Sequence, residues 1–160
     1  MNKENKKRIE SDYLRYTTEK YPSFKGKENL LPPYKTKEAG ANDLTRLVID
    51  FLTYNNCQAE RISSQGQYRD GKKQVTDVIG RVRTIGTGIW TKGSSTKGTA
   101  DVSATIKGRS IKIEIKFGTD RQSDAQKEYQ FSIEKALGIY IIVKTFDEFL
   151  LWYDNFLLNS

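Results

Sequence analysis

The chain has 160 residues, with 27 Lys and Arg against 20 Asp and Glu, which gives a net charge of +7 and an isoelectric point of about 9.4. It has no histidine, which excludes Ser-His triads and His-ligated zinc sites, and its one cysteine, Cys57, excludes an intrachain disulfide. The cysteine content fits a reducing compartment, and no apolar run is long enough to cross a membrane. We therefore expect a cytoplasmic protein with no membrane partner, whose basic charge favours a polyanion such as nucleic acid.

Residues 1–37 are polar and basic and are predicted to form an N-terminal extension. A short helix is expected over about 4–18, because Ile9, Tyr13 and Tyr16 recur at helical spacing, and prolines interrupt the chain after it. Two interpretations of this segment stay open. It is either a basic arm on DNA or a peripheral helix on the core.

Residues 38–160 are predicted to form the main domain, which starts with an amphipathic helix. Its apolar positions follow the i, i+3, i+4, i+7 rule, and Asn42 or Asp43 is the expected N-cap. Asn55 and Asn56 end this helix, and 58–64 is a predicted strand. The apolar helix positions are Leu44, Leu47, Val48, Phe51 and Leu52.

Residues 65–97 are predicted to form a basic, glycine-rich insertion, either a hairpin or a flap. Residues 61–100 contain eight basic and two acidic residues, so this quarter of the chain carries +6 of the net charge. Lys92 and Lys97 lie on a Gly/Ser loop and are expected to contact DNA. Arg81 and Arg83 alternate across Val82, which fits either phosphate contacts or a solvated strand face. Trp90 is expected to cap the core rather than to stack on a base.

The remaining elements alternate between strands and helices. Residues 100–106 and 110–117 are predicted as two strands joined by a tight turn at 107–109. A helix capped by Ser123 or Asp124 runs to about 137, a nearly all-apolar strand covers 139–143, and a final helix covers 146–157. This order predicts an α/β fold with a central mixed sheet flanked by helices, α-β-β-β-α-β-α.

The two hairpin strands place a constellation of charged residues on one face of the sheet. Asp101 lies near the start of the first strand, and Glu114 and Lys116 flank Ile115 on the second. Asp101 is expected beside Glu114 and opposite the region of Lys116. Two carboxylates and the Ile115 carbonyl suit Mg²⁺, and Lys116 is suited to polarise water and to stabilise phosphate charge. The alternative interpretation is an edge strand with a solvated ion pair.

Gly98-Thr-Ala-Asp101 followed by Glu114-Ile-Lys116 resembles the PD-(D/E)XK nuclease pattern. Residues 118–129, with Ser123 and Gln126 at a helix start and Tyr129 one turn later, are similar to the VRR-NUC branch, and the similarity runs from about 42 to 153. Its short forms resemble stand-alone phage or prophage nucleases. The resemblance implies a restriction-endonuclease-like fold and phosphodiester hydrolysis dependent on Mg²⁺ or Mn²⁺, in the cytoplasm of a bacterial or phage-infected cell.

The resemblance also assigns roles. Asp101 and Glu114 correspond to metal ligands, Lys116 to the catalytic lysine, and Gln126 to the helix glutamine that faces the site. The family often carries a first-helix glutamate, for which this chain offers Asn42, Asp43 or Glu38. Beside the site, Arg121, Lys127 and Tyr129 are expected to contact nucleic acid, with a solvated face as the alternative for the two cations.

The sequence therefore predicts a metal-dependent nuclease that acts on duplex, single-stranded or branched DNA, with a homodimer as a further implication of the resemblance. One alternative is a DNA-binding module on a nuclease fold that no longer cleaves. Another is a basic assembly or RNA-binding protein without an active site, for which the acidic residues would be dispensable.

Overall fold

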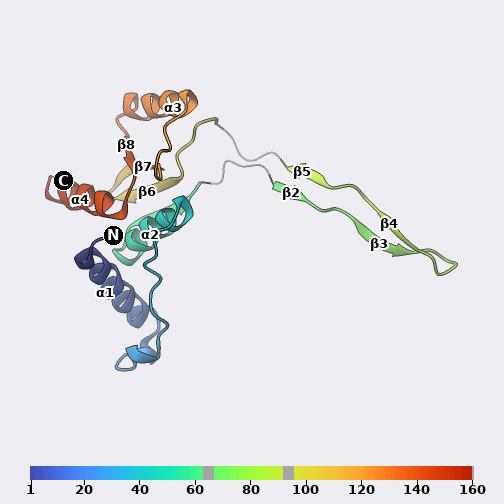
Figure 1. The fold of residues 1–160 in the computed structure, drawn as a ribbon, viewed down its shortest axis with the longest axis horizontal. Coiled ribbons are helices and arrows are strands. Elements are labelled where there is room, and N and C mark those ends of the chain that lie inside the picture. Colours follow the sequence, from blue (N-terminus) through green and yellow to red (C-terminus); the bar gives the residue numbers. More distant parts are fainter. Residues whose placement is uncertain (63–66, 92–95, 160) are drawn as a thin grey trace.

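The computed structural model describes residues 1–62, 67–91 and 96–159 (Figure 1). The N-terminal part holds α1 (Lys3–Lys20), the short 3-10 helices η1 (Pro22–Phe24) and η2 (Glu28–Leu30), α2 (Ala41–Tyr54) and β1 (Gln58–Arg61). Four short strands follow: β2 (Gln67–Arg69), β3 (Lys73–Thr76), β4 (Val82–Ile85) and β5 (Ile89–Thr91). The C-terminal part holds β6 (Val102–Ile106), β7 (Arg109–Ile115), α3 (Asp124–Lys135), β8 (Ile139–Val143) and α4 (Phe146–Leu158).

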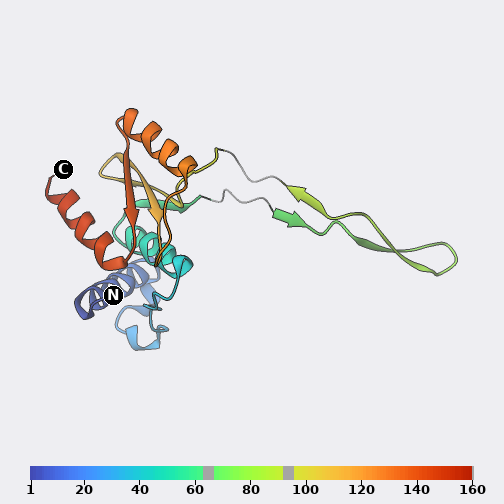
Figure 2. The same cartoon turned by 45° about the horizontal axis from the view of Figure 1, so that its top comes forward.

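A central four-stranded mixed sheet has the order β1-β6-β7-β8. The first three strands are antiparallel, and β8 runs parallel to β7 through the crossover helix α3. Helices α2 and α4 cover one face of this sheet, and α3 lies over the other (Figures 1 and 2). The predicted α/β class with a central mixed sheet is thus confirmed.

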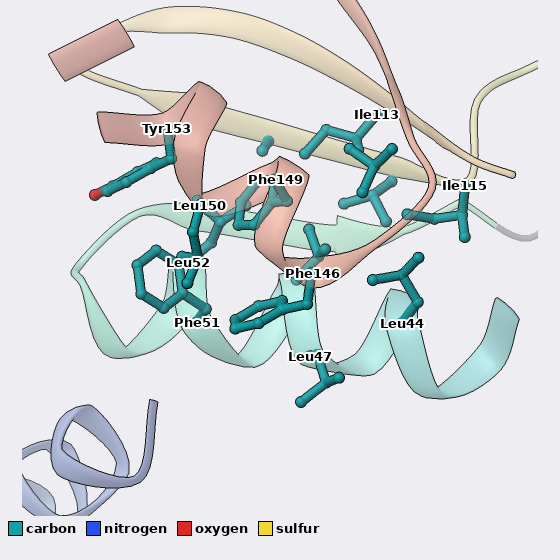
Figure 3. Close-up of a cluster of buried hydrophobic side chains, with 14 of the residues drawn as sticks. Leu44, Leu47, Phe51, Leu52, Ile113, Ile115, Phe146, Phe149, Leu150 and Tyr153 are labelled. Carbon is teal, nitrogen blue, oxygen red and sulfur yellow. The ribbon is translucent and has the colours of Figure 1, made fainter. Parts of the chain in front are cut away.

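The hydrophobic core lies between the sheet and helices α2 and α4 (Figure 3). Ile113 and Ile115 point from β7 into it, as the alternation along that strand predicted. Phe51 of α2 makes edge-on contacts with the rings of Phe146 and Phe149, with centroids 5.9 Å apart in both cases. Such aromatic pairs add to the free energy gained from burying apolar area, so this cluster fixes how α2 and α4 meet.

Helix α1 packs on the same core, although it is polar along most of its length. Ile9 is fully buried, and Arg8 forms a two-point ion pair with Asp154 of α4 at 2.7 Å while lying 5.1 Å over the ring of Phe51. The helix expected over 4–18 therefore exists and is slightly longer. Its position corresponds to the peripheral-helix interpretation rather than to a free basic arm.

The start of α2 differs from the prediction, because neither Asn42 nor Asp43 is the N-cap. Gly40 occupies that position, and both residues lie in the first helical turn. The Asp43 carboxylate instead accepts a hydrogen bond from the Ala39 N–H at 3.1 Å. At the other end, Asn55 caps the helix and Asn56 adopts a positive φ of 57°, as the predicted stop requires.

The β6–β7 hairpin is tighter than expected. Ile106 pairs with Arg109, so the turn consists of Lys107 and Gly108 alone, with φ values of 47° and 76°. Two residues with positive φ form the turn whose twist matches that of antiparallel strands. The last pair is Val102 with Ile113, which places Asp101 opposite Glu114 rather than toward Lys116. In this register Asp101 and Glu114 lie on the same face of the sheet, as predicted.

Residues 67–91 form a long hairpin, hereafter the arm, which projects away from the sheet in both views (Figures 1 and 2). Strands β2 and β5 pair at its base and β3 and β4 pair toward its tip, so the hairpin prediction is confirmed for this part of the insertion. Trp90 lies on β5 with 66% of its surface exposed. The expectation that it caps the core is therefore wrong.

Gly71 and Gly86 mark the point in the arm where one pair of strands gives way to the other. A Cβ on Gly86 would lie 2.5 Å from the Gly71 carbonyl oxygen, and Gly86 has a φ of +101°. Only glycine allows the two backbones to approach this closely.

Among the helices described here, none combines the length and the apolar character needed to cross a membrane.

Candidate active site

Glu114 and Lys116 lie at the carboxyl end of β7, on the sheet face that α3 covers. Their exposed fractions are 1% and 6%, although both are charged residues. The Lys116 Nζ lies 3.1 Å from a Glu114 carboxylate oxygen and 3.2 Å from the Asp120 carboxylate. A buried charge is tolerated only when it is paired and hydrogen-bonded, and each of these two residues meets that condition through the other.

Asp101 joins this pair from the neighbouring strand. It directly precedes β6, and its Oδ2 accepts a hydrogen bond from the Ile115 N–H at 2.9 Å. That contact fixes the carboxylate at the end of the hairpin. The other oxygen, Oδ1, accepts no hydrogen bond from the residues that the structure describes, which leaves it available to a ligand.

Gln126 connects the site to the first turn of α3. Its Oε1 accepts hydrogen bonds from the Ser123 N–H at 2.9 Å and from the Lys116 ammonium at 3.0 Å, and its Nε2 donates to Glu114. The Ser123 side chain in turn accepts from the Gln126 N–H, which completes a capping box. One glutamine thus starts the helix and holds both members of the buried pair, so the structure brings Gln126 together with Glu114 and Lys116.

Two residues of the site were absent from the sequence prediction. The Tyr140 hydroxyl donates to the second Glu114 oxygen at 3.3 Å, and Asp120 contacts Lys116. Tyr140 lies on β8, which pairs in parallel with β7, and its position faces α3. The sequence signal for Tyr140 was the alternation of side chains along that apolar strand, which places every second residue on the α3 face. For Asp120, the signal was its spacing of four residues after Lys116.

The electrostatics of the site follow from burial and from neighbouring charges. Burial raises the pKa of the Glu114 carboxyl, and the charge of Asp101 raises it further, against the opposing effect of Lys116. Burial acts to lower the pKa of the Lys116 ammonium, but its hydrogen bonds to Glu114 and Asp120 outweigh this, so the pKa lies above its usual range. Lys116 is therefore a fixed cation at neutral pH rather than a proton acceptor.

The donor set fits a divalent cation of the Mg²⁺ type. Such ions need only one or two protein carboxylates, with water and phosphate oxygens completing the shell. Asp101 and Glu114 supply two carboxylates whose charges repel one another, as the raised pKa of Glu114 indicates, and a cation would relieve that repulsion. The Ile115 carbonyl stays a predicted third donor. Both Glu114 oxygens already accept hydrogen bonds, so a metal ion would take the place of Lys116 at that carboxylate.

Among the described residues, the three candidates for the family's helix carboxylate, at and just before α2, all have hydrogen-bond partners outside this site. Glu38 accepts a hydrogen bond from the Phe146 N–H at the start of α4, and Asp43 binds the backbone just before α2. Asn42 accepts from Arg61 at 2.8 Å. Within the described part of the chain, no group of three or more acidic residues or cysteines is placed to hold a metal ion.

The residues predicted to bind nucleic acid fall in two places. Lys97 and Tyr129 line a groove between the segment before β6 and helix α3, where Gly98 allows close approach because a Cβ would lie 2.1 Å from the Ala125 carbonyl oxygen. Exposed Arg121 precedes α3, and Lys127 pairs with Asp124 on its surface. Two further predicted residues, Arg81 and Arg83, lie on the arm, and Lys92 lies outside the described residues.

Comparison with known proteins adds no identification. No protein-family model matches the chain. A search of curated proteins also finds no match.

Proposed function

We propose that this protein is a metal-dependent nuclease that hydrolyses phosphodiester bonds in DNA. The observation that carries the proposal is the constellation of Asp101, Glu114 and Lys116 at one end of the sheet, in which Gln126 holds the buried pair of Glu114 and Lys116. Burying the Glu114 carboxylate and the Lys116 ammonium costs free energy, and a solvated surface pair would impose no such cost. A catalytic role explains why the fold retains them.

Asp101, Glu114 and the Ile115 carbonyl would hold Mg²⁺ or Mn²⁺. When bound, the ion would supply a Lewis acid and a source of hydroxide near the scissile phosphate. Lys116 stabilises the negative charge that develops on the phosphate, and its raised pKa keeps it protonated for that task. Gln126 and Asp120 orient the Lys116 ammonium through their hydrogen bonds.

The finer fold proposal is a restriction-endonuclease-like domain of the VRR-NUC type, within the PD-(D/E)XK superfamily. It rests on the resemblance around Asp101, Glu114 and Lys116, supported by the mixed sheet and by the capping box at Gln126. Duplex, single-stranded and branched DNA are all substrates to test, and a homodimer remains a prediction.

The test is a cleavage assay on labelled single-stranded, duplex and four-way-junction DNA, with Mg²⁺, Mn²⁺ or EDTA. Cleavage should require a metal and should disappear in Glu114→Ala, while the variant keeps its affinity for DNA in EDTA because a negative charge near phosphate has been removed. Glu19→Ala, which removes an exposed carboxylate on α1, is the matched control. Lys116→Met should lose turnover, with Lys7→Met, which removes an exposed cation on α1, as its control. Cleavage by Glu114→Ala at the wild-type rate would refute the proposal.

A second candidate is a DNA-binding module that does not cleave. The observation that favours it is that, among the described residues, both candidates for the family's helix carboxylate, Glu38 and Asp43, accept hydrogen bonds from backbone N–H groups elsewhere. The same assay separates the two candidates. Tight DNA binding with no cleavage in either metal would support the binding module.

A further inference from the structure

The strands of the arm pair cations with apolar residues instead of with acids. Lys73 lies opposite Ile85, Arg83 opposite Val75, and Arg69 opposite Ile89. A ribbon that faced only water would gain stability from oppositely charged residues across its strands. The four arm strands contain no acidic residue, so no cation on them lies opposite an acid across the ribbon.

The two acidic residues of the arm serve its turns. Asp77 Oδ1 accepts hydrogen bonds from the Ile79 and Arg81 N–H groups at the tip, and Asp70 Oδ1 accepts from the Lys72 N–H. Asp77 also lies 3.7 Å from Arg83. The remaining cations have no ion-pair partner among the described residues, and all are exposed: Arg69, Lys72, Lys73 and Arg81. With five basic and two acidic residues, the arm carries a net charge of +3.

Exposed apolar side chains accompany these cations. Tyr68 and Trp90 face each other across β2 and β5 with 60% and 66% of their surfaces exposed, and Val78 and Ile79 at the tip are exposed as well. A large exposed apolar surface indicates a binding site. The partner must therefore combine negative charge with apolar or aromatic surface.

Duplex nucleic acid combines negatively charged phosphates with apolar sugar and base surface, and the length of the arm agrees with the length of one helical turn. At about 3.3 Å per residue, the 10 steps from Gln67 to Asp77 span about 33 Å, roughly one turn of B-DNA. The cations are spread along this length, as phosphates are along a duplex, and a two-stranded ribbon fits the major groove. A small acidic protein surface would instead favour a single cluster of cations.

We propose that the arm is a second nucleic-acid-binding element, which lies along a groove of duplex DNA beyond the proposed cleavage site. Its cations contact phosphates, while Tyr68, Trp90 and the tip residues Val78 and Ile79 contact sugars and bases. The choice of DNA rests on the proposed nuclease function. The arm extends that function by naming a duplex of at least one helical turn as the ligand.

The test is fluorescence anisotropy in EDTA, with a labelled duplex of about 30 base pairs, roughly 100 Å long, and a single strand of equal length, over a range of KCl concentrations. The arm variant carries Arg69→Ala, Lys72→Ala, Lys73→Ala and Arg81→Ala. The control variant removes four exposed cations of the N-terminal segment: Lys3, Lys7, Lys25 and Lys27. Because each phosphate contact contributes about 0.9 to the salt slope, the arm variant should lose a slope of about 3 to 4 and bind the duplex at least about 100-fold more weakly.

A tip variant, Val78→Ser with Ile79→Ser, separates apolar contact from charge. It should weaken duplex binding by about tenfold and leave the salt slope unchanged, because it removes no cation. Both variants should melt at the wild-type temperature, since no arm residue belongs to the core. The wild type should also bind the duplex more tightly than the single strand, and the arm variant should lose that preference.

Equal salt slopes for the arm and control variants would overturn the proposal, as would wild-type protein that binds no duplex. A wild-type dimer that becomes monomeric in the arm variant, with duplex affinity unchanged, would assign the arm to a second copy of the chain and overturn it too. The nuclease proposal fails separately. Duplex binding through the arm without metal-dependent cleavage would contradict only the enzyme, and cleavage with an inert arm would contradict only this inference.

Discussion

Replacing Gln126 by leucine removes the amide that connects α3 to the buried ion pair, while keeping a similar side-chain volume. Three hydrogen bonds are lost, to the Ser123 N–H, the Lys116 ammonium and the Glu114 carboxylate. The Ser123 side chain still accepts from the backbone N–H of residue 126, so the helix keeps half of its capping box. The loss falls mainly on the two charged groups.

The magnitude follows from the partners that remain. A hydrogen bond to a charged group contributes about 1.5 to 3 kcal/mol, and two are removed. Lys116 keeps Glu114 and Asp120, and Glu114 keeps Lys116 and Tyr140, so neither charge is left alone. We therefore expect a loss of about 2 to 3 kcal/mol in the free energy of unfolding. For a chain of this size, this lowers the melting temperature by about 5 to 10 °C.

The assay is urea denaturation followed by circular dichroism, paired with calorimetry, in EDTA so that metal binding does not contribute. Lys127→Met is the control, because Lys127 directly follows Gln126 on the same helix. The substitution removes an exposed ion pair with Asp124 and should lower the free energy of unfolding by at most about 0.5 kcal/mol. If Gln126→Leu costs no more than this control, then the glutamine does not support the buried pair and the reasoning fails.

Three further predictions concern other parts of the molecule. Because burial raises the pKa of Glu114 in the folded state, its stabilising contribution is present below the ordinary carboxyl pKa and is lost as the pH rises through the raised value. Between these two pKa values, the metal-free wild type should lose stability relative to Glu114→Gln as the pH rises. A difference in unfolding free energy that does not change with pH in urea melts would contradict this. Arg8→Ala, which removes the two-point pair with Asp154, should cost about 1 to 2 kcal/mol in the same melts, and a cost near zero would show that α1 docks without it. Gly86→Ala should disturb the arm alone, because the new Cβ would meet the Gly71 carbonyl; faster proteolysis of the arm at an unchanged melting temperature is expected, and equal proteolysis would argue against strain there.

Much of the sheet could be predicted from the sequence because its strands alternate. Ile113 and Ile115 had to face one side and Glu114 and Lys116 the other, whatever the register. The start of α3 was equally readable, since Ser123 with Gln126 three residues later is a local signal for a capping box. These features depend only on the residues beside them in the chain.

The features that could not be predicted depend on distant contacts. Lys107 adopts a positive φ, which is not expected for a lysine, so the turn was predicted one residue too long. Tyr140 belongs to an almost wholly apolar strand, and only the parallel pairing with β7 brings its hydroxyl to Glu114. The docking of helix α1 on the core was one of two open interpretations, because its one fully buried residue, Ile9, is too weak a signal to decide between them.

The tight turn at Lys107 and Gly108 has a consequence for recognising related chains. Asp101 and Glu114 meet because the hairpin folds back around those two residues, and their separation along the chain is 114 − 101 = 13 positions. Lengthening both strands by one residue would widen that interval to 15 and leave the two carboxylates facing each other, whereas inserting a single residue would turn one of them toward the core. Related chains should therefore keep an odd separation between the two carboxylates, but not necessarily 13 positions. A search pattern with a fixed gap would overlook chains whose hairpin is longer or shorter.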